Sequence, residues 1–433
     1  MDYQRCADLH NEIMYQGWTE SDRDWVQPQS WWQHQAPSAE TASQLSPSLI
    51  EFLKRAYRTP NNSRYPHCFF YYLGGLASAD DMIADGFLDI VEPNRYVLLY
   101  TTSPWNLDDK FGLAFDLHTS TATFIPNYNE AVEIGQHEFS WLPLEVILQG
   151  YLDMLNEGKV RIVPVTERQD WNYEGPTLVR PWQLYPYTPI DVQRAASAMK
   201  RLIDAIEAQI ERLSGPTAAD SYTHLPWHDP DAFPDELVPP STFAYDFLKA
   251  ISDIRVRFRY IAPGIRIPSL DEFLNQAYYG DDPLQIFIIE SSDATPLDPP
   301  DHGWSQYTIG VHITHADPYA DRHFTNEFRL ELPFRVGARG FAKQSSGQPL
   351  GIDPEKEEPV PMGSRGELYQ AGMSNGFTDY HGVQIDRVLE SWAGMVERGD
   401  WVVGVEGVLG GIEKFMEADT EEHWAKYTVA HSW

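Results

Sequence analysis

The side chains with the clearest capacity for chemistry lie in one stretch, GVHITHADPYADRH, which runs from Gly310 to His323. It holds three histidines and two aspartates within fourteen residues. Imidazole and carboxylate groups are the ligands that zinc and other transition metals bind, usually with three or four of them at one point. The stretch therefore raises the question of a metal site.

Two sets of three side chains there are candidate metal ligands: His312, Asp321 and His323, or His315, Asp317 and Asp321. The residues SQYTIGVHIT alternate in polarity and are rich in β-branched types, which predicts a strand over Gly310–His315. On a strand, His312 and His315 point to opposite faces, which works against a shared metal. We therefore expect a strand and then a solvated turn over Asp317–Asp321, with no metal and no cofactor bound.

No sequence motif names a reaction. The chain contains no phosphate-binding loop, no dinucleotide fingerprint, no nucleophile elbow, no HExxH zinc motif and no paired CxxC. Catalytic residues are therefore not assigned from the sequence, and whether the chain is an enzyme stays open.

The charge balance limits the partners. The chain has 64 acidic and 32 basic residues, a formal net charge of −32. Binding to nucleic acid or to an anionic membrane needs clustered Lys and Arg, so both are excluded as expected partners. A protein partner with a basic surface is the natural complement, although the same charge also serves solubility alone.

Two further observations bear on location. The chain has no apolar run of about 18 residues, so we expect no transmembrane helix, and its first residues do not have the pattern of a signal peptide. It has two cysteines, Cys6 and Cys68, which we expect to be free thiols in a reducing compartment. The sequence therefore predicts a cytoplasmic protein.

The pattern of apolar residues predicts an α+β fold in two related halves, each with a mixed or antiparallel sheet flanked by amphipathic helices. Helices are expected near 48–57, 144–157, 189–213, 269–278 and 385–398, and strands at RYVLLYTT and FGLAFDLHTSTATFIP. The predicted organisation is an irregular arm (1–44), a first domain that ends in a long helix (45–213), a Pro- and Asp-rich linker (214–241) and a second domain (242–433). The residues expected in the core are Phe52, Leu53, Leu148, Tyr151, Phe273, Leu274, Leu389 and Trp392.

The two halves share sequence patterns. SLIEFLKRAY at 48–57 and SLDEFLNQAY at 269–278 are identical at seven of ten positions. The apolar register of 144–157 and its following glycine, Gly158, recur at 385–398 and Gly399. We expect a tandem duplication with an insertion in the second copy; the alternative is a chance likeness between amphipathic helices.

The first copy resembles the Smi1/Knr4-like (SUKH) superfamily over residues 46–158. The resemblance is carried by LIEFLKRAY, FFYYLGGLASADDM, YVLLYTT, FGLAFDLHT and SWLPLEVILQGYLDML. It implies a helix, an apolar strand with glycines, a sheet and a closing helix, and it implies a non-enzymatic binding or regulatory module. The alternative function is an enzyme of unrecognised type, such as one of specialised metabolism, with an aromatic-lined pocket and Asp/His chemistry.

Overall fold

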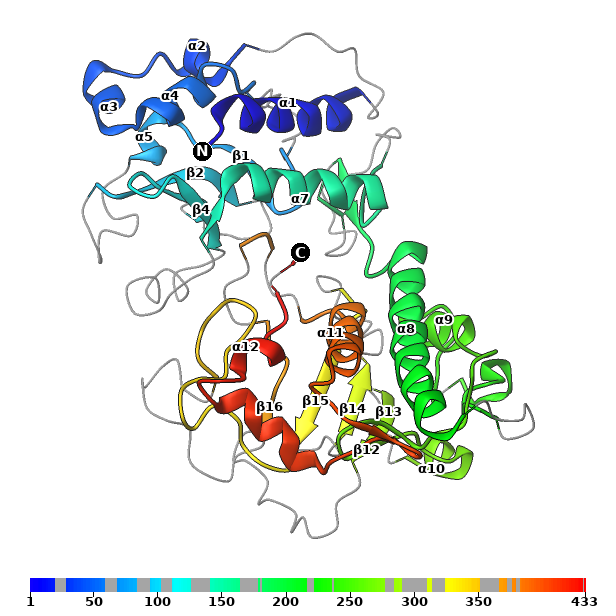
Figure 1. Cartoon of the computed structure of the whole chain (residues 1–433). Coiled ribbons are helices and arrows are strands. Elements are labelled where there is room, and N and C mark those ends of the chain that lie inside the picture. The colour runs from blue at the N-terminus through cyan, green and yellow to red at the C-terminus, as the bar shows by residue number, and fades with distance from the viewer. Residues whose placement is uncertain are drawn as a thin grey trace, which may run out of the picture.

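In the computed structural model, two lobes each combine a sheet with helices (Figure 1). This confirms the α+β class. The structure describes residues 1–19, 29–58, 68–83, 94–102, 111–125, 141–163, 178–179, 181–215, 222–235, 237–276, 284–289, 310–313, 324–350, 366–371, 376–378, 382–430 and 432–433. Among these residues, no helix has both the length and the apolar character needed to cross a membrane.

The N-terminal lobe is built on a five-stranded antiparallel sheet in chain order. Its strands are β1 (Leu73–Leu76), β2 (Tyr96–Thr102), β3 (Gly112–Asp116), β4 (Thr121–Ile125) and β5 (Leu142–Pro143). Its helices are α1 (Tyr3–Thr19), α2 (Trp31–Gln35), α3 (Ala39–Gln44), α4 (Pro47–Leu53), α5 (Ala79–Met82) and α7 (Leu144–Glu157). A small sheet of β6 (Val160–Ile162), β8 (Trp182–Leu184) and β7 (Leu178–Val179), in that order, leads toward the second lobe.

The C-terminal lobe contains an eight-stranded sheet in the order β16-β15-β14-β13-β12-β11-β18-β17, in which only the β11–β18 pair is parallel. The strands are β11 (Tyr260–Ala262), β12 (Ile265–Arg266), β13 (Leu284–Ile289), β14 (Gly310–Ile313), β15 (Phe328–Leu332), β16 (Gly366–Glu367), β17 (Val403–Gly404) and β18 (Gly407–Val408). The helices are α8 (Pro189–Ser214), η2 (Pro230–Ala232), α9 (Phe243–Ala250), α10 (Leu270–Leu274), α11 (Ile385–Arg398), η3 (Ile412–Asp419) and α12 (Trp424–Tyr427). A separate pair is formed by β9 (Thr223–His224) and β10 (Arg255–Val256).

The helix boundaries follow from capping residues in the sequence. Thr188 and Asp191 form a capping box at the start of α8, and Pro189 occupies the first turn, where its missing N–H costs nothing. Both α7 and α11 have 14 residues and end at a glycine in the left-handed conformation, with φ of 75° at Gly158 and 76° at Gly399. The predicted helix ends are confirmed at these positions.

The residues expected in the core are buried, with one exception. Phe52, Leu53, Leu148, Tyr151, Phe273, Leu389 and Trp392 are at most 1% exposed. Leu274 is 40% exposed, so its predicted burial is wrong. The reason is the length of α10: in this five-residue helix only Phe273 is buried.

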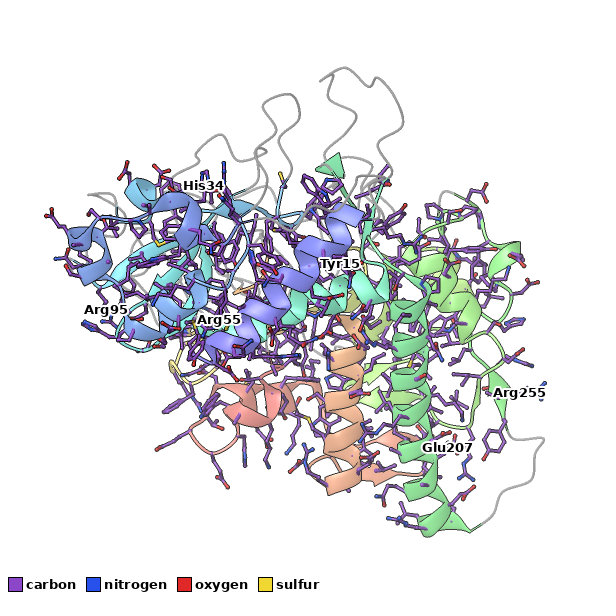
Figure 2. All side chains as sticks on the ribbon, turned by 90° about the horizontal axis from the view of Figure 1, so that it is seen from above. Tyr15, His34, Arg55, Arg95, Glu207 and Arg255 are labelled. Carbon is purple, nitrogen blue, oxygen red and sulfur yellow. The ribbon has the colours of Figure 1, made fainter. Side chains whose placement is uncertain are left out.

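Three of the expected boundaries differ from the structure. The predicted irregular arm contains α1, whose face of Cys6, Leu9, His10, Ile13 and Met14 is buried in the N-terminal core. The long helix α8, placed in the first domain, packs its buried stripe into the C-terminal core, and Figure 2 shows it beside α11. The predicted linker also enters that core through Leu225, Trp227, Leu237 and Val238, so its Pro-rich composition does not mean exposure.

The duplication stays a prediction. In each lobe the residue before the 14-residue helix forms a β-bridge at the strand next to a sheet edge. Pro143 pairs with Thr121 of β4, and Gln384 pairs with Glu327, directly before β15. The second lobe differs by its extra strands β11, β12, β17 and β18.

A buried ion pair joins the lobes. Lys159, directly after Gly158, and Asp191 of α8 are at most 1% exposed at their side chains, and Nζ lies 2.9 Å from Oδ2. The ammonium also donates to the Pro186 carbonyl oxygen at 3.2 Å and to Asn326 Oδ1 at 3.4 Å, and it lies 4.2 Å from the centroid of the Phe324 ring. Burial lowers the pKa of Lys159, while the carboxylate of Asp191 opposes that shift.

Packing around α7 completes the junction. The Tyr151 hydroxyl donates to the Phe377 carbonyl oxygen at 2.7 Å. A Cβ at Gly150 would lie 2.7 Å from the Phe377 ring and 3.2 Å from Trp433, so only glycine allows this close approach. Gln384 at the start of α11 donates to the Trp433 carbonyl oxygen, which places the C-terminus between the lobes (Figure 1).

We predict that Leu148→Ala and Leu389→Ala each lower the free energy of unfolding by about 2–5 kcal/mol, because each removes a fully buried side chain from a packed core. Val146→Ala on the exposed face of α7 is the control and should cost little, since Val146 is 44% exposed. Chemical denaturation followed by tryptophan fluorescence measures all three. Unchanged midpoints for both leucine variants would contradict the packing described.

Candidate functional site

The structure places only part of the predicted His/Asp stretch. Gly310–Ile313 forms β14, which confirms the first part of the expected strand. His315, Asp317, Asp321 and His323 lie outside the described residues, and His312 is described by its backbone alone. Within the described part of the chain, no three His, Cys, Asp or Glu side chains gather as metal ligands. The expectation of no metal in the stretch itself stays a prediction.

His312 lies in a polar row of the large sheet. In register it stands between Gln285 of β13 and Arg329 of β15. One step further along, Glu331 of β15 stands directly opposite Glu367 of β16. Directly opposed residues share a face of the sheet, with Cβ atoms about 5 Å apart, so these two carboxyl groups are neighbours.

The pair of glutamates has unusual electrostatics. The pKa of the Glu367 carboxyl is raised to about 8. Burial is the largest cause, Arg329 opposes it, and the nearby Glu331 and Glu327 add to it. Glu367 is therefore mainly protonated at neutral pH. A protonated carboxyl can donate a hydrogen bond or a proton, which a carboxylate cannot.

A second candidate is a groove of about 480 Å³ on the C-terminal lobe. Two histidines line it, His224 and His228, with ring centroids 5.3 Å apart. Arg266, also in the groove, forms a bidentate ion pair with Glu272 at 2.5 and 2.8 Å, which holds the pKa of Glu272 down at about 2. Arg259 adds a further exposed cation to the lining.

The groove thus holds two arginines and one glutamate, with one of the arginines paired to the glutamate. Nearby, Arg255 extends outward from β10 (Figure 2), and its strand partner is His224. Sequence reasoning missed the groove because one wall comes from β9 and the other from β12 and α10, which α9, β10 and β11 separate from β9 in the chain. The only local signal was the HLPWH spacing of its two histidines.

The large aromatic side chains serve the cores. Five tryptophans are at most 2% exposed: Trp31, Trp182, Trp227, Trp392 and Trp401. The groove has one aromatic residue in its lining, Phe258. These tryptophans therefore do not form the aromatic-lined pocket of the enzyme alternative.

The buried His10 and the two cysteines of the N-terminal lobe have structural roles. His10 lies 2.7 Å from the Tyr57 carbonyl oxygen through Nε2 and 2.8 Å from the Tyr100 hydroxyl through Nδ1. Because a carbonyl only accepts, Nε2 carries the proton and Nδ1 accepts from Tyr100. Cys6 and Cys68 are both buried free thiols, and burial raises the pKa of each, that of Cys68 to about 12. Neither is therefore activated as a nucleophile.

Comparison of the chain with protein-family models, with curated proteins and with solved structures finds no match.

We predict that Glu367→Gln stabilises the protein at alkaline pH. The folded-state pKa of Glu367, about 8, exceeds its ordinary value of 4.5, so its contribution is fully present below pH 4.5 and is lost as pH rises through 8. The free energy of unfolding of the wild type should therefore fall by about 2 kcal/mol or more between pH 6 and pH 9, and that of the variant should not show this fall. Denaturant titrations at the two pH values measure this, with the exposed Glu413→Gln as control. A parallel pH dependence in Glu367→Gln and wild type would contradict the assignment.

We also predict an acid-sensitive N-terminal lobe. Burial lowers the pKa of His10 to about 4 from an ordinary 6.5. As pH falls, His10 is therefore protonated in the unfolded chain before it is protonated in the folded protein, which favours unfolding. Stability should therefore fall by about 2 kcal/mol between pH 7 and pH 5. His10→Gln keeps a donor and an acceptor but does not titrate, so its stability should change less over this range. Equal losses in both proteins, measured by denaturant titration, would refute this origin.

Proposed function

We propose that this chain is a non-enzymatic interaction or regulatory protein of the Smi1/Knr4-like kind, with a basic protein as its partner. The observation that carries the proposal is the net charge of −32. An acidic surface attracts a basic partner over long range, speeds the encounter and disfavours acidic competitors.

The use of buried polar groups supports the same function. Lys159 and Asp191 join the lobes, and His10 holds α1 onto the N-terminal core. The Tyr151 hydroxyl bonds the backbone at Phe377. These groups have roles in stability.

The free, buried thiols support a reducing compartment, and we place the protein in the cytoplasm. The arrangement of α4, a meander of strands and the closing helix α7 is the order that the resemblance to the Smi1/Knr4-like superfamily implies for residues 46–158. That superfamily implies binding rather than catalysis.

We predict that partner binding depends steeply on salt. Tagged protein should capture a basic protein from its own cells at low ionic strength, and the purified pair should dissociate in about 0.5 M salt because exposed charges are then screened. Mass spectrometry identifies the partner, and titration at several salt concentrations gives the dependence. An acidic partner, or a complex insensitive to salt, would contradict the proposal.

A further inference from the structure

The hairpin of β17 and β18 carries apolar side chains on its outer surface. Val402, Val405 and Leu409 are 63%, 65% and 52% exposed. Strands with one face on a core usually place polar residues on the other face. Val405 lies between β17 and β18, at the connection where turn residues such as Gly, Asn or Asp are usual. The exposed apolar residues are therefore a departure from the expected pattern.

The hairpin is held firmly on the lobe. Its inner residues Val403 and Val408 are buried and pair across the strands. At its end, the Glu406 carbonyl oxygen accepts from the backbone N–H groups of Arg259 and Tyr260, each at 3.0 Å. The outer side chains are thus presented on a fixed support, which lowers the entropy lost when a partner binds.

The apolar surface continues past the hairpin. Leu409 lies across Gly404, where a Cβ would stand 2.7 Å from the leucine Cδ2. Gly410 and Gly411 follow Leu409 and line a hollow of about 330 Å³ together with Met416, which is 47% exposed, and with the charged residues Arg339, Glu413, Lys414 and Glu417. We name Val402, Val405, Leu409 and Met416 the hairpin surface.

The hairpin surface has an acidic surround. Between Trp401 and Glu422 the chain has six acidic residues and one lysine. Lys414 is ion-paired with Glu417 at 2.6 Å, and Asp419 accepts three backbone N–H groups of residues 339–342. The exposed carboxylates of this segment are Glu406, Glu413, Glu421 and Glu422; the cations beside it are Arg339 and Lys414, which line the same hollow, and Arg259, whose backbone N–H bonds Glu406. An exposed apolar patch with a charged rim is typical of a protein interaction site.

We propose that the hairpin surface is where the basic partner docks, through an amphipathic segment with apolar residues on one side and Lys or Arg beside them. The apolar side chains supply contact with Val402, Val405 and Leu409, and the cations meet the glutamate rim. The assignment rests on the proposed function, since it takes the partner to be a basic protein.

The test uses a defined probe, a fluorescent helical peptide with leucines on one face and lysines on the other. Fluorescence anisotropy should show binding to the full chain, about tenfold weaker binding to Val402→Ser/Leu409→Ser, and unchanged binding to Val146→Ser, which alters an exposed valine of α7. All three proteins have the same net charge. The same peptide with glutamates in place of lysines should not bind.

Equal affinity of the double variant and the wild type, or no binding of the lysine peptide to the full chain, overturns the assignment. A wild type that is dimeric in sedimentation, and a double variant that is monomeric, would show a second copy of the chain as the occupant and would also overturn it. If a basic natural partner binds both proteins equally and dissociates with salt, the proposed function stands and the hairpin surface alone fails.

Discussion

The ion pair of Lys159 and Asp191 is the interaction on which the arrangement of the lobes depends. It lies where α7 ends, where α8 begins and where the chain enters β15, so three separated segments meet at one ammonium group. A buried charge without a partner would cost several kcal/mol, so the three segments must stay together for Lys159 to remain charged. The capping box at Thr188 adds to this constraint, since Asp191 Oδ2 also accepts from the Thr188 N–H and hydroxyl.

Around this junction the lobes share their apolar packing. Phe324 and Phe377 come from the part of the chain that builds the second lobe, yet they belong to the core of the first. Gly150 permits that contact because any side chain there would collide with the Phe377 ring. The lobes are therefore joined by packed side chains as well as by charge, and the acidic exterior and the hairpin surface are carried on a common support.

The sequence predicted local features well and the organisation of the chain less well. Thr188, Pro189 and Gly158 define helix ends by short-range hydrogen bonding and backbone geometry, which a pattern of residues can reveal. Helix α1 was missed because its buried face includes His10, a residue type usually counted as polar. The sequence prediction also placed α8 in the wrong lobe. An amphipathic stripe shows that a helix packs on a core, but it does not show which core.

The candidate sites show the same limit. The groove with His224 and His228, and the opposed carboxyls of Glu331 and Glu367, arise from strand pairing between distant segments. No local motif encodes that pairing. The exposed valines of the β17–β18 hairpin were visible in the sequence, but an apolar strand reads as buried until its neighbours are known.

Calorimetry of Lys159→Met tests most directly whether the junction unites the lobes. We expect the wild type to unfold in one transition and the variant to unfold in two. The variant should also lose about 3–5 kcal/mol of its free energy of unfolding, because Asp191 is left as an unpaired buried charge. Lys159→Met with Asp191→Asn should recover part of the loss, since asparagine is neutral and can still accept from Thr188. A single transition in Lys159→Met at the midpoint of the wild type would contradict the account.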